Sequence, residues 1–196
     1  MYSLSWMVFI NKSQAEIEIK RYKSNNLIKL ILPDDQWVRF HFEKAEYDLN
    51  MAKANLGLSE RENIDTSSWV IIMSYYAMFH SVNALLRKIG VKVGKENSHE
   101  VTTNSLLYYL YYTKIIEDEL LKAYEKAEGK ARDLMVNYIY VKEERKEYQY
   151  EADKRSEIDC AKKILRDSEL FVSHLKDIEK TLNKDLVLIR LGKSCL

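Results

Sequence analysis

Apolar residues along most of the chain recur at intervals of three and four, which is the spacing of one face of an α-helix. The first strong helix signal follows Pro33, where Asp34 and Asp35 can cap a helix that proline cannot continue. Apolar positions then repeat from Trp37 onward, and Gly57 stands where a C-cap glycine is expected. This pattern predicts a helix over about 37–56.

The next predicted helix is the most apolar part of the chain. It begins at the cap signal of residues 65–67 and runs to Gly90. Residues 66–86 carry no charge at neutral pH and are about as long as a membrane span. Several of them are polar, however, and no second such segment exists. We therefore predict a central helix that is buried on several sides. If Tyr76 and Phe79 are both buried, replacing either with alanine should cost about 3–5 kcal/mol.

Helical spacing predicts further helices separated by short breaks. They are a short helix over 13–22, one containing 101–111, a long charged one from about 113 to 148, and a last one over about 156–182. Residues 91–97 are expected to form a polar loop. The tail contains the sequence LVLIRL, which predicts a short strand or helix that docks on the body or on a partner.

The composition supports an all-α fold. The chain has 196 residues but only five glycines and one proline, whereas a sheet-rich fold uses both in frequent turns. We predict an up-and-down bundle of four or five helices over residues 34–182. Residues 1–33 are expected to form an N-terminal extension and residues 183–196 a C-terminal tail.

Charge and cysteine content narrow the classes of partner and compartment. Lys and Arg number 31 against 30 Asp and Glu, so the net charge of the chain gives no argument for nucleic-acid binding. Only a local basic groove could bind a nucleic acid. Cys160 and Cys195 form no metal-ligand spacing, and two cysteines in a chain of this size do not make a disulfide framework. This cysteine content favours a reducing cytoplasm. The N-terminus lacks the pattern of a signal peptide, and no membrane association is expected.

Most motifs of enzymes and cofactor sites are absent, and neither a cofactor nor a metal site is predicted. His80, Asn83 and Arg87 stand at i, i+3 and i+7, so they share one stripe of the apolar central helix. Two interpretations remain open. In the first, the stripe is structural: it is either the solvent-exposed edge of the helix or a buried hydrogen-bond network. In the second, the stripe is a polar binding site at a dimer interface.

The segment Ser74–Leu86, SYYAMFHSVNALL, resembles the HEPN domain family, whose helix commonly reads close to AYYAMFHAANALL. Gly90, Lys92 and Ser98-His99 follow at the expected places, and Arg145 with Glu147-Tyr148 resembles the later Arg…Ala-Asp-Tyr segment of the family. The resemblance covers residues 34–182. It implies a four- to five-helix bundle that forms a homodimer. Many members are metal-independent ribonucleases or toxins, often paired with a minimal nucleotidyltransferase antitoxin, or belong to defence systems.

Active members of the family carry an Arg-x(4–6)-His motif at the dimer cleft. Arg145 matches the arginine, but Tyr150 stands where the histidine is expected. A tyrosine is a poor general base at neutral pH, since its ordinary pKa is about 10. The resemblance thus gives Arg145 and Tyr150 as candidate catalytic residues. The candidate binding residues are His80, Asn83, Arg87, His99 and Tyr148.

Three hypotheses follow. The first is a non-catalytic, cytoplasmic, dimeric module that binds a nucleotide, RNA or a protein within a toxin–antitoxin or defence system. The second is a ribonuclease toxin that uses Arg145 with Tyr148, Tyr150 or a histidine from elsewhere. The third is a structural or assembly protein whose extension, residues 1–33, and tail dock onto a larger complex.

Overall fold

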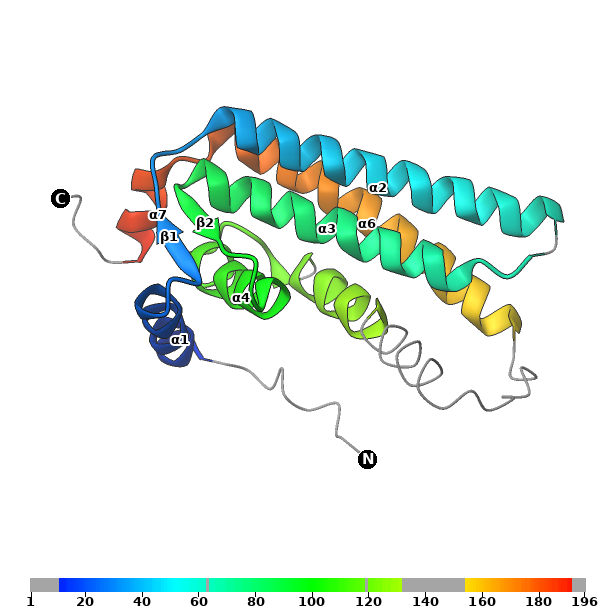
Figure 1. The fold of residues 1–196 in the computed structure, drawn as a ribbon, viewed down its shortest axis with the longest axis horizontal. Coiled ribbons are helices and arrows are strands. Elements are labelled where there is room, and N and C mark those ends of the chain that lie inside the picture. The colour runs from blue at the N-terminus through cyan, green and yellow to red at the C-terminus, as the bar shows by residue number, and fades with distance from the viewer. Residues whose placement is uncertain (1–10, 63, 119, 132–153, 192–196) are drawn as a thin grey trace.

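The computed structural model is a helical bundle with a small two-stranded sheet at one end (Figure 1). The structure describes residues 11–62, 64–118, 120–131 and 154–191. The elements in chain order are α1 (Lys12–Ser24), β1 (Ile28–Leu30), α2 (Asp35–Glu62), α3 (Ser67–Lys88), β2 (Val91–Val93), α4 (Ser98–Ser105), the π-helix η1 (Leu106–Tyr111), a helical segment over 118–131, α6 (Lys154–Thr181) and α7 (Lys184–Arg190). The predicted all-α bundle is confirmed.

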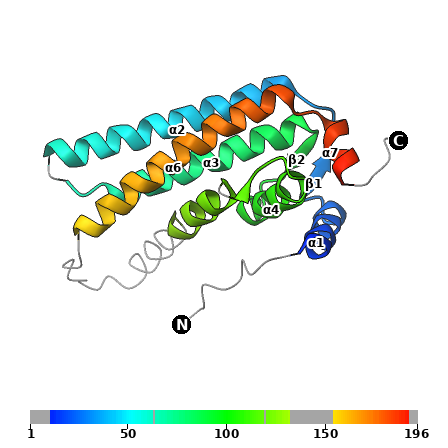
Figure 2. The same cartoon turned by 180° about the vertical axis from the view of Figure 1, so that it is seen from behind.

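Helix α3 lies at the centre of the bundle and packs against both α2 and α6 (Figures 1 and 2). Val70, Met78 and Leu85 on this helix are fully buried. By length and composition α3 could cross a membrane, but 67% of its most apolar 18-residue window is buried inside the protein. This burial favours the predicted core helix.

The apolar side chains of α3 are not all buried to the same extent. Tyr76 and Phe79 are only partly buried, whereas Tyr75 and Met78 are 3% and 0% exposed. Each residue advances about 100° around a helix, so a shift of one position turns a side chain out of the core. The burial expected for Tyr76 and Phe79 is therefore only partial: both side chains keep an accessible side, and Phe79 packs against the core.

Local signals set the start of α2 as predicted. The Asp34 carboxylate accepts hydrogen bonds from the backbone N–H groups of Gln36 and Trp37, at 3.1 and 3.3 Å. These bonds satisfy donors that the first turn of a helix cannot pair internally. The helix accordingly begins at Asp35, directly after the predicted break at Pro33.

The predicted end of α2 is wrong, because the helix continues through Gly57 to Glu62. A glycine inside a helix costs about 1 kcal/mol relative to alanine, and packing can outweigh such a preference. The far half of α2 is linked to α6 by ion pairs of 2.7 Å between Lys53 and Glu169 and 2.8 Å between Lys162 and Glu60. Tertiary contacts thus extend the helix beyond its local stop signal.

The expected loop over 91–97 contains strand β2, which pairs antiparallel with β1. Gly90 leads into this strand with a φ of 76°, a conformation that favours glycine. A Cβ at Gly90 would lie 2.3 Å from the carbonyl oxygen of Ile31, so the close approach of the two strands also requires glycine. The pairing joins segments far apart in the sequence, and no local pattern marks it.

The described part of the N-terminal extension packs against α4. The Tyr22 hydroxyl donates to Glu100 at 2.7 Å and accepts from the Asn104 amide at 2.6 Å. Tyr22 itself is only 2% exposed. Helix α1 and strand β1 therefore share the core of the end of the bundle that carries the sheet.

The C-terminal tail forms a helix, α7, of the two structures that its sequence allowed. Asn183 caps it by accepting the Leu186 N–H at 2.7 Å. At its other end, Arg190 donates to the carbonyl oxygens of Thr113 and Lys114, at 3.1 and 2.9 Å. Helix α7 therefore docks on the turn that follows η1.

This turn also corrects the start of the long charged helix. Residues 112–116 are not helical, and the helix that follows them begins at residue 118. Lys114 adopts a φ of 57°, which ends the preceding helix. The rest of the predicted helix beyond residue 131 lies outside the described residues.

Candidate functional site

Two matching stripes of side chains face each other across α2 and α3. Each stripe has members at i, i+4, i+7 and i+11, which places them on one side of its helix. The members are Trp37, His41, Lys44 and Asp48 on α2, and Tyr76, His80, Asn83 and Arg87 on α3. Because the two helices run antiparallel, the start of one stripe meets the end of the other (Figure 1).

Three contacts join the stripes. The guanidinium carbon of Arg87 lies 5.1 Å from the centre of the Trp37 ring. The Nδ1 atoms of His41 and His80 are 3.3 Å apart. Nε2 of His80 lies 3.8 Å from the nearer carboxylate oxygen of Asp48. The stripes thus form a continuous seam of aromatic, imidazole and charged groups.

Burial keeps both histidines of the seam neutral at physiological pH. Desolvation lowers the pKa of His41 to about 4, helped by the charges of His80 and Arg87. It also lowers the pKa of His80 to about 4, with smaller contributions from Lys44 and His99. A neutral imidazole does not form an ion pair, so the contact between His80 and Asp48 is that of a neutral ring beside a carboxyl group.

The geometry of the pair favours one distribution of protons. Asp48, on the Nε2 side of His80, favours a proton on that nitrogen. Nδ1 of His80 can then accept a hydrogen bond from the Nδ1–H of His41, which leaves Nε2 of His41 with a lone pair. The pair can therefore accept a proton or a hydrogen bond, while Arg87 and Lys44 supply the positive charge nearby.

His99 at the start of α4 extends the seam. Its Nδ1 lies 2.7 Å from the Tyr75 hydroxyl, and its ring centre lies 4.7 Å from that of Phe79. The ring of Tyr76 lies edge-on to it at 5.7 Å. Buried Tyr75 thus fixes the orientation of His99 beside half-buried aromatic rings.

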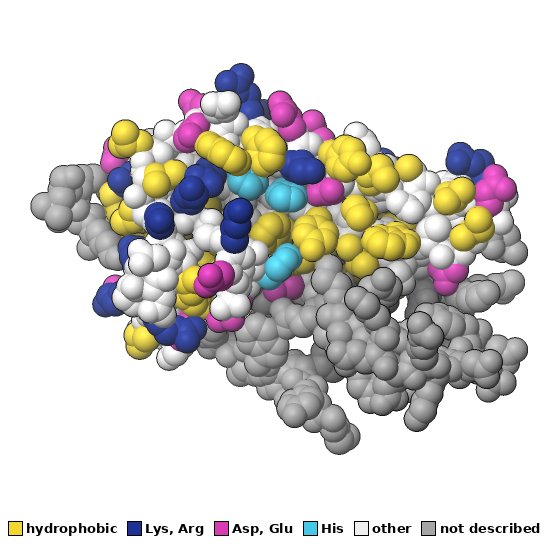
Figure 3. All heavy atoms as spheres, in the orientation of Figure 1, with side chains coloured by type: hydrophobic (Ala, Val, Ile, Leu, Met, Phe, Trp, Pro, Cys, Tyr) yellow, Lys and Arg dark blue, Asp and Glu magenta, His cyan; other side chains and the backbone are white. Residues whose placement is uncertain are grey.

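We call this surface the histidine face and define it by its members: His41, His80, His99, Trp37, Phe40, Lys44, Tyr76, Phe79 and Arg87. Figure 3 shows histidine side chains on the side of the molecule that α2 and α3 present, among hydrophobic side chains and next to Lys and Arg. Trp37 and Phe40 are each 44% exposed there. Helix α6 lies behind, on the opposite side of the bundle (Figure 2).

The predicted binding residues that the structure describes do not all lie in the same surroundings. His80 and His99 belong to the histidine face. Asn83 is 8% exposed and its amide donates to the Phe79 carbonyl and to Thr102, so it links α3 to α4. Arg87 is 9% exposed and packs on Trp37.

The remaining predicted site residues cannot be compared with the geometry. Arg145, Tyr148 and Tyr150 lie outside the described residues. The candidate catalytic pair and its relation to the histidine face therefore stay predictions.

Sequence reasoning missed the α2 half of the seam, namely Trp37, His41, Lys44 and Asp48. Their shared spacing was the available signal, since it repeats the interval of the α3 stripe. What the spacing could not give is the register of the two helices, which decides that His41 meets His80.

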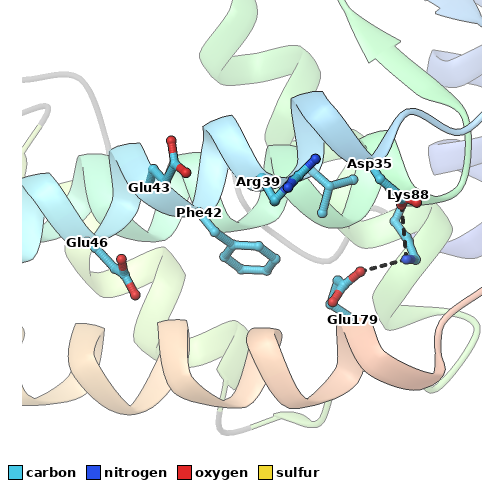
Figure 4. Close-up of a pocket in the computed structure, with 8 residues that line it drawn as sticks. Asp35, Arg39, Phe42, Glu43, Glu46, Lys88 and Glu179 are labelled. Atoms are coloured by element: carbon cyan, nitrogen blue, oxygen red, sulfur yellow. Dashed lines mark hydrogen bonds and ion pairs between the residues drawn. The ribbon is translucent and has the colours of Figure 1, made fainter.

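A groove lies on another side of α2. Its volume is about 400 Å³, and it is lined by Asp35, Val38, Arg39, Phe42, Glu43, Glu46, Lys88 and Glu179 (Figure 4). Lys88 bridges Asp35 and Glu179 at 3.2 and 2.7 Å, and Phe42 projects toward the groove. Lys88 is thus already paired with two carboxylates of the groove.

Within the part of the chain that the structure describes, no three His, Cys, Asp or Glu side chains gather as a metal-binding group. A family model described as HEPN domain matches residues 38–178 of the 196-residue chain, which includes every member of the two stripes except Trp37, one residue before the match begins. No curated protein and no solved structure matches the chain.

Proposed function

The chain belongs to the HEPN domain family, and on that premise we propose that its histidine face binds RNA or a nucleotide. The observation that carries the proposal is the pair of Trp37 and Arg87. Trp37 is 44% exposed, and the Arg87 guanidinium is held over its ring at 5.1 Å. An exposed aromatic ring beside a guanidinium is a platform on which an unpaired base can stack.

Charge on the same face supports this proposal. The guanidinium of Arg87 and the ammonium of Lys44 are near enough to lower the pKa values of His41 and His80, respectively. Both cations can pair with phosphate groups, whereas the two neutral histidines can exchange hydrogen bonds with bases and sugars. The face thus combines stacking and phosphate contacts without the high overall charge of a general nucleic-acid binder.

Binding is favoured over the cleavage chemistry of the family because Tyr150, and not a histidine, follows Arg145 at the required spacing. The test is fluorescence anisotropy with a short labelled single-stranded RNA, the same RNA as a duplex, and labelled ATP. Loss of base stacking at Trp37→Ala should cost about 1–3 kcal/mol, or about fivefold to 150-fold in affinity.

The control is Lys180→Ala, an exposed cation on α6 that pairs with Asp177 and is not a member of the histidine face. It should leave the affinity for single-stranded RNA unchanged, while Arg87→Ala weakens it and reduces its salt dependence. Equal affinities in Trp37→Ala, Arg87→Ala and the control, or no binding by any of these proteins, would refute the proposal.

A second candidate function is metal-independent RNA cleavage, which the contact between His41 and His80 favours. A neutral imidazole can take the proton of a ribose 2′-hydroxyl while the hydroxyl oxygen attacks phosphorus and displaces the 5′-oxygen, which takes a proton from water. Arg87 nearby can stabilise the negative charge on the non-bridging phosphate oxygens. Cellular RNA incubated in EDTA should then be cleaved by the wild type and left intact by His41→Ala and Arg87→Ala. Cleavage lost only in Arg145→Ala would assign the activity to the motif residues instead.

We further propose that the protein acts as a cytoplasmic homodimer with a nucleotidyltransferase-type antitoxin partner, as the family resemblance suggests. Light scattering after size-exclusion chromatography measures the oligomeric state directly. A pull-down from the native cytoplasm tests the partner, and substitution of Ile17, which is 56% exposed on α1, tests the alternative of an assembly protein without removing a core side chain. A monomer that retains no partner would contradict the proposal.

A further inference from the structure

His41 and His80 are 39 residues apart in the sequence, but their Nδ1 atoms face each other at 3.3 Å across the seam of α2 and α3. This separation is slightly longer than a well-formed hydrogen bond to nitrogen, whose usual range ends near about 3.2 Å. It agrees with the span of two nitrogen ligands on a tetrahedral ion: Zn–N bonds of about 2.0–2.1 Å place the two nitrogens about 3.3–3.4 Å apart.

We propose that Nδ1 of His41 and Nδ1 of His80 together bind a divalent transition-metal ion of the Zn²⁺ type. Water molecules complete the coordination, since the pair supplies two protein ligands. The site lies within the histidine face, but the proposal does not rest on RNA binding, because its test measures the bound ion directly.

Binding requires movement of rings and not of helices. The two Nδ1 atoms now point along the line that joins them, with ring centres 5.6 Å apart. Each ring must turn, and the proton of His41 must move from Nδ1 to Nε2, before both lone pairs can meet on one ion. The terminal torsion of a histidine has a broad energy profile, so the rotation costs little.

Asp48 is positioned to support the bound state. A metal-bound histidine commonly donates its other ring N–H to a carboxylate, which fixes the tautomer and strengthens the ligand. The Asp48 carboxylate lies 3.8 Å from Nε2 of His80, and the side chains of His80 and Asp48 are only 20% and 11% exposed. This contact keeps Nδ1 of His80 free of its proton and available to an ion.

The chemistry of the pair favours a cation over an anion as its ligand. Metal binding requires deprotonated imidazoles, and the pKa values of both histidines, about 4, leave them neutral at pH 7. Arg87 and Lys44 oppose a bound cation, so their charges weaken the site, whereas Asp48 strengthens it.

Zn²⁺ alone is the probe. The full chain is treated with chelator, dialysed, and titrated with Zn²⁺ by isothermal titration calorimetry; Co²⁺ serves as a spectroscopic substitute. We expect one ion per chain and the visible absorption bands of tetrahedral Co²⁺. His41→Gln and His80→Gln should each weaken binding by at least about tenfold, and Asp48→Asn by about 10–100-fold. Lys44→Gln should strengthen it, which a merely structural role would not produce.

His174→Gln is the matched control, because His174 lies exposed on α6 with a ring nitrogen 3.1 Å from the Leu170 carbonyl. It should bind Zn²⁺ as the wild type does. Circular dichroism without metal shows whether each variant folds, and ring ¹⁵N shifts of His41 and His80 in the wild type report ligation without any substitution. Unchanged affinity in His41→Gln and His80→Gln, or ring shifts confined to other histidines, would overturn the proposal whatever the outcome of the RNA experiments.

Discussion

Arg87, near the end of α3, lies with its guanidinium carbon 5.1 Å from the centre of the Trp37 ring, near the start of α2. Arg87 is 9% exposed and Trp37 44%, so the cation is the more deeply placed partner. Burial lowers the pKa of Arg87, which reflects the cost of keeping its charge away from water. The ring of Trp37 offsets part of this cost.

The first prediction concerns the strength of that contact. A double-mutant cycle of Arg87→Met and Trp37→Leu, followed by urea unfolding, should give a coupling free energy of about 0.5–2 kcal/mol. The lower end applies if water screens the pair through the exposed edge of the tryptophan. Additive effects of the two substitutions would mean that the stacked geometry does not stabilise the fold.

The second prediction separates neighbouring tyrosines of α3. Tyr75→Ala should cost about 3–5 kcal/mol in free energy of unfolding, because it empties a fully enclosed part of the core. Tyr76→Ala should cost clearly less, since that ring is only partly buried. Chemical denaturation of both variants measures the difference. Equal losses would mean that the two rings are equally buried.

The third prediction concerns stability at alkaline pH. Burial, followed by the hydrogen bond to Glu100, raises the pKa of Tyr22 from 10 to about 12. A hydroxyl with a raised pKa favours the neutral form in the folded state. Its contribution to stability is therefore complete below pH 10, and it is lost as the pH rises through 12.

Tyr22→Phe tests this relationship, since it keeps the ring and removes the titrating group. The variant should be about 1–2 kcal/mol less stable at neutral pH, where the hydrogen bonds to Glu100 and Asn104 are lost. Between pH 10 and pH 12 its stability should fall less steeply than that of the wild type. Parallel curves of unfolding free energy against pH would contradict the assignment.

The fourth prediction compares two glycines. Gly90→Ala should destabilise the protein by about 1–3 kcal/mol, because φ is 76° and the new Cβ would meet the Ile31 carbonyl oxygen at 2.3 Å. Gly129→Ala is the matched control, since its Cβ would meet nothing within 4 Å and it lies in a helix. That variant should be about 0.5–1 kcal/mol more stable. Thermal unfolding of both variants shows whether each substitution lowers or raises the stability of the protein.

Several helix boundaries could be predicted because their causes are local. Pro33 with Asp34 sets the start of α2, and the Asp65 carboxylate accepts the Ser67 N–H at 3.0 Å at the start of α3. Gly57 shows the limit of such signals. A C-cap glycine is only a preference of about 1 kcal/mol, and packing on α3 and α6 carries the helix past it.

The sequence by itself thus determined the all-α class, the central apolar helix and the resemblance to the HEPN domain family, because these depend on composition, periodicity and short motifs. Tertiary structure alone decided the pairing of β1 with β2, the meeting of His41 with His80 and the stacking of Arg87 on Trp37. Each of these contacts depends on how distant segments are aligned. That alignment is set by the packing of whole elements, so no local spacing records it.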